Sequence, residues 1–286
     1  MTTLELYHSV LRRLVAAGIP DPEAEAILLL RHLLECRRSD VFLQGGRVVA
    51  PPLIEQAERA ISRRLAREPL AYILGEQEFY GRPFAVTPAV LIPRPETELL
   101  VERAVAVLRA TEGKERIRVL DLGVGSGVIA ITLALEIPTA TVVAVDLSLP
   151  ALGVARGNAC HHGVAARVQW LNADWGTALR GGYGFDLVAA NPPYVAERIA
   201  ASLQPELAAE PATALYGGED GRREIERILG DASRLLCPGG LLLMEIGFDQ
   251  EGYVLARLDA LGGFAQVTVQ RDYAGLPRVL EARRGS

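Results

Sequence analysis

The sequence predicts an α/β protein in which a mostly parallel sheet, covered by helices on both faces, follows a small helical domain. Half of the 286 residues are hydrophobic, so a large buried core is expected. After residue 117, short and nearly all-apolar segments alternate with helical patterns, which is typical of a parallel sheet buried on both faces. Before residue 75 the apolar residues recur only at helical spacing.

The first 75 residues are expected to form a small helical domain. Leu4–Val15 has helical spacing, and Asp21-Pro22-Glu23 predicts the start of a second helix, with Asp21 as the capping side chain. A further helix is expected over Leu53–Arg67, after breaks at Gly45-Gly46 and Pro51-Pro52. The domain is therefore predicted to span residues 1–75.

A linker and then the sheet domain follow. Aromatic and β-branched residues around a Gly turn in Glu78–Val86 predict a β-hairpin, within a linker over residues 76–95. Helical spacing resumes at Thr97, so the sheet domain is predicted over residues 96–286. Its strands are expected at Arg118–Leu122, Thr141–Asp146, Arg167–Leu171, Phe185–Ala190 and Gly240–Ile246, with helices starting at Val128, Leu149, Arg222 and Tyr253 and an antiparallel pair at Gln266–Val269 and Arg278–Glu281.

Composition narrows the class of protein. The formal charge of −5 argues against a domain whose main task is to grip phosphate backbones. Cys36, Cys160 and Cys237 are few and far apart, with no spacing that indicates a metal site, so reduced thiols are expected. No signal peptide or membrane-spanning run is visible. We therefore expect a cytoplasmic protein that binds no membrane. The sequence leaves its oligomeric state open, and a monomer is the expectation.

A glycine-rich turn indicates a ligand site. Val119–Val128 reads as a strand, a Gly-x-Gly-x-Gly turn and the start of a helix, and glycines there let the backbone approach a ligand closely. This pattern alone is weak evidence, because dinucleotide and phosphate sites use similar loops. Asp121, just before the glycines, would repel a pyrophosphate but suits a cationic ligand such as S-adenosylmethionine. Asp146 ends the next strand, where it can accept hydrogen bonds from ribose hydroxyls or cap the following helix.

A third strand end adds to this site. Asp174 and Trp175 follow it, where an acid can bind the adenine amino group and the indole can cover the ring. Trp175 as an ordinary core residue is the alternative.

Asn191-Pro192-Pro193-Tyr194 follows the fourth predicted strand and indicates the chemistry. Two prolines fix φ, remove two backbone donors and stiffen the turn. The Asn191 side-chain oxygen and the Pro192 carbonyl would form a pair of acceptors for an NH2 group, and Tyr194 would stack on the flat group that carries it. Such acceptors orient a poorly nucleophilic nitrogen and stabilise positive charge as it develops. The alternative is a proline-stiffened loop with an Asn cap.

With these motifs, the sequence resembles the protein-(glutamine-N5) methyltransferases that modify peptide chain release factors. The resemblance also includes Pro69–Gly75, Leu91–Glu98, Gly217–Gly221, Leu243–Gly247 and Arg271–Gly275, and it runs from about Pro69 to Glu281. It implies a Rossmann-like class I S-adenosylmethionine-dependent methyltransferase sheet with an antiparallel C-terminal edge. It further implies that the first domain helps to recognise the substrate, which is the glutamine of the Gly-Gly-Gln loop in class 1 release factors.

The predicted site has three groups and no metal. Asn191, Pro192 and Tyr194 are the catalytic candidates, and Asn191, Pro192, Pro193 and Tyr194 are expected to bind the substrate. The cofactor is expected to contact Asp121, Gly123, Val124, Gly125, Ser126, Gly127, Asp146, Asp174, Trp175 and Asn191.

Three alternatives share parts of this pattern. A ribosomal-protein glutamine methyltransferase has the same Asn-Pro-Pro-Tyr motif, but the block from Ile92 to Glu98 favours the release-factor group. A DNA adenine-N6 methyltransferase uses a similar loop on a flipped base, against which the acidic balance and the lack of a basic domain argue. A non-catalytic partner of the translation machinery that binds an adenosyl ligand is disfavoured by the intact Asn191–Tyr194.

Overall fold

The computed structural model describes residues 1–110, 114–182 and 184–285. Its internal contacts divide the chain into two compact units. The first comprises Met1–Glu76 and Gln204–Ala209, and the second comprises Gln77–Leu203 and Glu210–Ser286. Within the described ranges, no helix is both long and apolar enough to span a bilayer.

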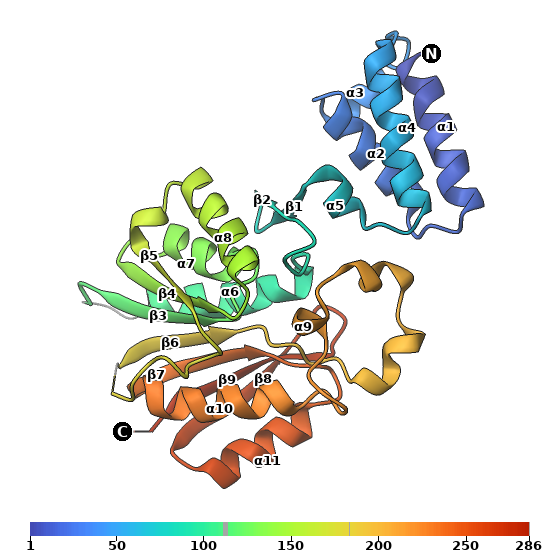
Figure 1. Ribbon diagram of the computed structural model, residues 1–286. Coiled ribbons are helices and arrows are strands. Elements are labelled where there is room, and N and C mark those ends of the chain that lie inside the picture. The colour runs from blue at the N-terminus through green and yellow to red at the C-terminus, as the bar shows by residue number, and fades with distance from the viewer. Residues whose placement is uncertain (111–113, 183, 286) are drawn as a thin grey trace. The chain divides into compact units, whose positions relative to one another are not determined.

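The first unit is helical, as the sequence predicts. Its helices are α1 (Thr3–Ala16), α2 (Pro22–Leu33), α3 (Arg38–Leu43), α4 (Pro51–Leu65) and α5 (Leu70–Leu74) (Figure 1). A capping box between Thr2 and Glu5 begins α1. The apolar faces of these helices share one core that includes Leu6, Val10 and Leu30.

Two details of this unit differ from the prediction. Asp21 precedes α2 but has φ 47° and makes no side-chain capping hydrogen bond. The start of the helix is instead stabilised by Pro22 at its first position and by the acidic residues of its first turn. Pro51-Pro52 is not a break but the first turn of α4, since proline at the start of a helix loses no intrahelical hydrogen bond.

A segment from far along the chain completes the first unit. The guanidinium of Arg64 is almost fully buried, and it donates to both Glu25 oxygens and, at 2.9 Å, to Glu206 of the 3-10 helix η3 (Pro205–Ala209). Arg67 also donates to Glu206, at 3.3 Å. Because an unpaired charge in this buried position would cost much free energy, these ion pairs hold η3 specifically against the helices of the first unit.

The second unit begins at Gln77, the second residue of β1 (Glu76–Phe79), which forms a hairpin with β2 (Arg82–Ala85). Tyr80 and Gly81 both have positive φ at its turn, which matches the twist of a two-residue hairpin. The Tyr80 amide donates to Glu98 of α6 (Pro95–Arg109) at 2.8 Å. The hairpin is therefore fastened to the helix that opens the sheet domain.

The rest of the second unit is a seven-stranded sheet in the order β5-β4-β3-β6-β7-β9-β8. Its first five strands pair in parallel, and β9 and β8 form the antiparallel edge. The strands are β3 (Ile117–Leu122), β4 (Ala140–Asp146), β5 (Val168–Asn172), β6 (Phe185–Ala190), β7 (Leu236–Glu245), β8 (Phe264–Arg271) and β9 (Pro277–Arg284). The predicted strands are thus confirmed, although β7 starts earlier than expected.

Helices cover both faces of this sheet (Figure 1). One core joins a sheet face to α6, α7 (Val128–Glu136) and α8 (Leu149–His161), and the other joins the opposite face to α10 (Arg223–Leu235) and α11 (Glu251–Leu261). Alternate strand residues serve the two cores: Val119 faces the first and Leu120 the second. Because β3 lies between β4 and β6, the loops after these strands meet at one edge of the sheet, where open α/β sheets bind ligands.

Candidate active site

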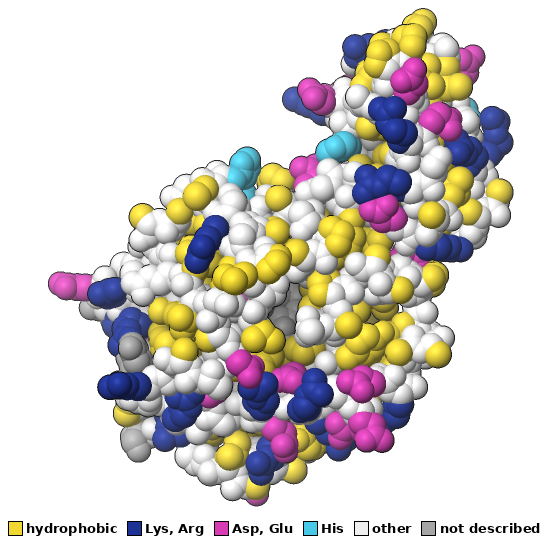
Figure 2. All heavy atoms as spheres, in the orientation of Figure 1, with side chains coloured by type: hydrophobic (Ala, Val, Ile, Leu, Met, Phe, Trp, Pro, Cys, Tyr) yellow, Lys and Arg dark blue, Asp and Glu magenta, His cyan; other side chains and the backbone are white. Residues whose placement is uncertain are grey.

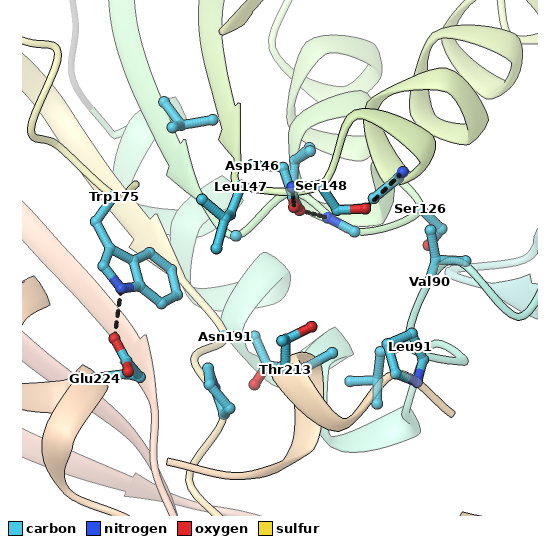
Figure 3. A pocket seen from close by; sticks show the side chains of 18 of the residues that line it. Val90, Leu91, Ser126, Asp146, Leu147, Ser148, Trp175, Asn191, Thr213 and Glu224 are labelled. Carbon is cyan, nitrogen blue, oxygen red and sulfur yellow. Dashed lines mark hydrogen bonds between the residues drawn. The ribbon is translucent and has the colours of Figure 1, made fainter. Parts of the chain in front are cut away.

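A pocket of about 400 Å³ lies at this edge. It has the size of a small-molecule site, and Figure 3 shows Asp146, Trp175 and Asn191 around the same cavity. The loops after β3, β4, β5 and β6 all contribute to its wall. Of the predicted site residues, the wall includes Gly123, Val124, Gly125, Ser126, Asp146, Asp174, Trp175, Asn191 and Pro193, but not Asp121, Gly127, Pro192 or Tyr194.

The glycine loop is shaped by close approach. Gly123 has φ 80°, and a side chain there would meet the Trp175 ring at 3.0 Å. Gly127 has φ 89° and stands behind the loop, where a side chain would meet Ile131 Cδ1 at 2.7 Å. The first glycine therefore leaves room inside the pocket, and the last lets the loop pack on the helices α7 and α8.

Asp146 joins the glycine loop to the end of β4. Its Oδ2 accepts from the Gly125 amide and its Oδ1 from the Ser148 amide, both at 2.8 Å. Burial raises the pKa of Asp146, and these two amides oppose the rise. Each oxygen keeps a lone pair, so the carboxylate can still accept from a bound hydroxyl.

Asp121 was expected to contact the cofactor, but its side chain does not border the pocket. Its side chain is fully buried beneath the loop, where Oδ2 accepts from the Ala130 amide at 3.1 Å. Its Oδ1 has no hydrogen-bond partner among the described residues. Burial raises the pKa of Asp121 to about 7, and the nearby Asp146 adds to the rise.

Trp175 forms one wall of the pocket and is held by a carboxylate. Its φ is 49°, and its Nε1 donates to Glu224 Oε2 at 2.7 Å (Figure 3). Glu224 also accepts from Arg223 and Arg227, and Arg227 pairs with Asp174 at 2.6 Å. Although burial raises the pKa of Glu224, its hydrogen bonds to Arg223, Trp175 and Arg227 bring it below the usual value.

Asn191 comes directly after β6 and faces the pocket from the opposite side. Its Nδ2 donates to Thr97 Oγ1 at 3.0 Å, and that hydroxyl donates to Glu245 Oε2 at 2.7 Å. The Tyr194 hydroxyl donates to Glu245 Oε1 at 2.9 Å. Because Tyr194 lies outside the pocket wall, the structure gives it a supporting position beneath the loop.

The back of the Asn191 loop is packed against glycines. A side chain at Gly217 would collide with the Pro193 carbonyl, and one at Gly221 with the Tyr194 carbonyl. The buried Gln250 donates to the carbonyls of both Tyr194 and Gly221, at 3.2 and 3.1 Å. The turn at Gly217–Gly221 therefore forms the support of the loop.

The outer wall of the pocket comes from two further segments, residues 89–94 and the region of α9 (Ala212–Leu215). Glu210 is buried and accepts from the Ile92 amide at 3.0 Å and from Arg94 Nη2 at 2.5 Å. One carboxylate thus holds the two segments together.

The sequence analysis gave no role in the site to four residues that support it: Thr97, Glu210, Glu224 and Glu245. One of them carried a signal, because Glu245 is an acid at the end of the apolar run Leu241–Met244, where a buried charge needs a partner. The other three belong to amphipathic or loop segments in which an exposed polar residue is the ordinary expectation.

Comparison with known proteins agrees with this architecture. Two family models match the chain: the PrmC N-terminal domain over residues 5–75 and the methyltransferase small domain over residues 97–221. A release factor glutamine methyltransferase of Koribacter versatilis is 41% identical over 285 residues, which cover 99% of each chain. One of Bordetella pertussis is 44% identical over 258 residues, covering 90% of this chain and 93% of the relative.

Solved structures show the same fold at low sequence identity. The N-terminal domain of human METTL16 in complex with SAH is 17% identical, has a TM-score of 0.53, and is matched over 84% of this chain and 86% of its own. A methyltransferase from Pyrococcus furiosus is 18% identical with a TM-score of 0.51, over 81% and 98% of the two chains. The predicted Rossmann-like methyltransferase sheet is therefore confirmed.

Proposed function

This chain belongs to the release factor glutamine methyltransferase family, and on that premise we propose that it methylates the side-chain amide nitrogen (N5) of the glutamine in the Gly-Gly-Gln loop of class 1 peptide chain release factors. The observation that carries the proposal is the placement of Asn191. Its side chain borders the same pocket as the glycine loop and Asp146, and Thr97 holds its NH2 group.

S-adenosyl-L-methionine is the proposed methyl donor, with S-adenosyl-L-homocysteine as the product. The pocket fits such a ligand: it lacks a side chain at Gly123, it carries acceptors at Asp146, and it has an aromatic wall at Trp175. When bound, the donor supplies a methyl group activated on a sulfonium. Asp174 borders the pocket but pairs with Arg227, so we propose that Trp175 and Asp146 make the main cofactor contacts.

The chemistry proposed for the Asn191 loop is orientation of the amide nitrogen. The Asn191 Oδ1 and the Pro192 carbonyl accept the two N–H bonds, so the nitrogen lone pair points at the methyl group. A nitrogen–carbon bond forms as the sulfur–carbon bond breaks, and the electron pair of that bond returns to sulfur. The nitrogen then loses one proton to water, and the acceptors stabilise its positive charge until that proton leaves.

The N-terminal helical unit is the proposed docking element for the release factor, which is the role that its family membership implies. We propose the domain division expected from the sequence: recognition by residues 1–75, a linker over 76–95 and catalysis by 96–286. The substrate belongs to the translation machinery, so the site of action would be the cytoplasm, and the chain would act there as a monomer.

A DNA adenine substrate is the less favoured reading of the same loop. Over α10 and α11, Figure 2 shows acidic and basic side chains interleaved, and Arg227, Arg234 and Arg257 each pair with an acid. Arginines already paired with acids gain less from a phosphate backbone than unpaired ones.

The test is methyl transfer from labelled S-adenosylmethionine to three separate acceptors: a class 1 release factor, a ribosomal-protein substrate and duplex DNA. We expect label in the release factor, on its Gly-Gly-Gln glutamine, and a release factor with that glutamine replaced by glutamate should accept none. Label only in DNA or only in the ribosomal protein would contradict the proposal.

A further inference from the structure

We propose that Glu245 and Thr97 are positioning residues that fix which end of the Asn191 amide faces the substrate. The inference rests on the proposed function, because it assigns Asn191 Oδ1 as an acceptor for the amide that is methylated. Its observations are separate from the motif: Thr97 lies on α6 and Glu245 ends β7, far from Asn191 in sequence.

The first step concerns Glu245. Its side chain is fully buried, and each of its two oxygens accepts a hydrogen bond from a hydroxyl group: Oε2 from Thr97 at 2.7 Å and Oε1 from Tyr194 at 2.9 Å. Both hydroxyls therefore direct their hydrogens at Glu245, which is the arrangement that a carboxylate without a proton to donate requires. Burial, with a smaller contribution from the nearby Glu96, raises the pKa of Glu245, and the hydrogen bonds from Thr97 and Tyr194 and the charge of Arg278 oppose this rise without cancelling it.

The second step concerns Thr97. A hydroxyl has one hydrogen, and that of Thr97 is used on Glu245, so Thr97 Oγ1 can only accept from a third group. The third group is Asn191, whose side-chain nitrogen lies 3.0 Å away. The carboxylate thus dictates that the NH2 end of Asn191 faces Thr97, and the carbonyl end is left for the pocket.

The consequence is a preference between two amide orientations that have nearly the same shape. If Asn191 were rotated by half a turn, its oxygen would face the lone pairs of Thr97, and its NH2 would face the NH2 of a substrate amide. Two donors cannot bond to each other, so the rotated form would repel the group that must be oriented. Preorganisation of this kind lowers the barrier to the reaction rather than the dissociation constant of the cofactor.

Thr97→Val is the direct test, because it keeps the shape of the side chain and removes the hydroxyl. We expect kcat at saturating release factor and cofactor to fall about tenfold to hundredfold, with the Kd for S-adenosylhomocysteine within about threefold of wild type. Thr97→Ser restores the hydroxyl and should return kcat to within about threefold of wild type.

A matched control is available in the same unit. Thr132 in α7 is fully buried, and its hydroxyl has no hydrogen-bond partner among the described residues. Thr132→Val therefore makes the same chemical change without breaking a hydrogen bond, and we expect its kcat to equal that of wild type. If Thr97→Val does not fold, as judged by its melting temperature against Thr132→Val, Glu245→Gln is the second variant. Its amide offers one acceptor to two hydroxyls, and we expect a lower kcat.

Three results would overturn the inference. They are a Thr97→Val or Glu245→Gln enzyme with kcat within about threefold of wild type, a Thr97→Ser enzyme as impaired as Thr97→Val, and a loss confined to the Kd for S-adenosylhomocysteine. The kcat of each variant is compared with that of the wild type on whichever acceptor the wild type methylates: release factor, ribosomal protein or DNA. The identity of that acceptor tests the proposed function, and the ratio of variant to wild type tests the positioning; transfer to none of the three would sink both.

Discussion

The two loops that meet in the pocket are held in different ways. The glycine loop after β3 is fixed mainly by its neighbouring strand, since Gly123 and Val124 both donate to the Val145 carbonyl, at 2.9 and 3.0 Å. Asp146, one residue further along that strand, accepts from Gly125. One backbone carbonyl and one side chain of the adjacent strand therefore shape this loop.

The Asn191 loop after β6 is fixed by side chains from remote parts of the chain. Thr97, Glu245 and Gln250 contact it from three different segments. Remote side chains can set the position of a single polar atom more finely than a loop can by itself. The difference suggests a division in which the first loop determines cofactor affinity and the second determines the rate of methyl transfer.

Asn191→Ala should have the largest effect, and it tests whether the Asn191 loop determines the rate of methyl transfer. Removing the acceptor should lower kcat by about 10²- to 10³-fold, the usual cost of losing one preorganised hydrogen-bonding group. The Kd for S-adenosylhomocysteine, measured by titration calorimetry, should change little. A variant with near-normal turnover would show that the acceptor argument is wrong.

Gly221→Ala tests whether the support of the Asn191 loop matters as much as its own residues. A methyl group would collide with the Tyr194 carbonyl at a position where φ is 77°, so we expect about 2–4 kcal/mol less stability and a lower kcat. Gly157→Ala is the control, since Gly157 lies in α8 with open space around it. It should gain about 0.5–1 kcal/mol. Equal melting temperatures for the two variants would refute the packing argument.

Asp146→Ala tests whether the glycine loop determines the affinity for the cofactor. It removes the acceptor that holds Gly125 and faces the pocket, and we expect a Kd for S-adenosylhomocysteine about tenfold to hundredfold higher. At saturating cofactor, kcat should recover most of its wild-type value. If kcat stays low at saturation while the Kd is unchanged, the two loops do not divide the work in this way.

The smallest effect concerns Asp121 beneath the glycine loop. Its pKa is about 7 in the folded chain and near 3.9 in an unfolded one. Between these values the folded state holds a proton that the unfolded state has released, so the free energy of unfolding falls as the pH rises. From pH 6 to pH 7 this group should account for about 1 kcal/mol. Asp121→Asn should remove that part of the slope in urea unfolding; an unchanged slope would contradict the assignment.

Asp121 and Asp146 also show what the sequence could predict. Asp121 was expected at the cofactor because it stands just before the glycine turn, and Asp146 because it ends the next strand; the strand and turn positions are as predicted. Strand periodicity alone does not say how deeply a side chain at that edge is buried. Asp146 reaches the pocket wall, whereas Asp121 lies under the loop, with its Oδ2 on the amide of Ala130.

The Asn191 loop shows a second limit. Local sequence predicted a stiff turn with an acceptor, and the structure has Asn191 in the pocket wall. Stacking of the Tyr194 ring on the substrate stays a prediction, whereas the motif gave no sign that the Tyr194 hydroxyl is held by Glu245, a residue 51 positions away. Contacts across that distance depend on the tertiary fold, so the pattern of the motif could not reveal them.

The most direct test is to locate the methyl group itself. A class 1 release factor is incubated with S-adenosylmethionine and either the wild-type chain or Asn191→Ala, and the product is fragmented in a mass spectrometer. We predict one methyl group on the side-chain nitrogen of the Gly-Gly-Gln glutamine with the wild type, and almost none with the variant in the same time. A methyl group on another residue, or equal methylation by the two proteins, would contradict the mechanism.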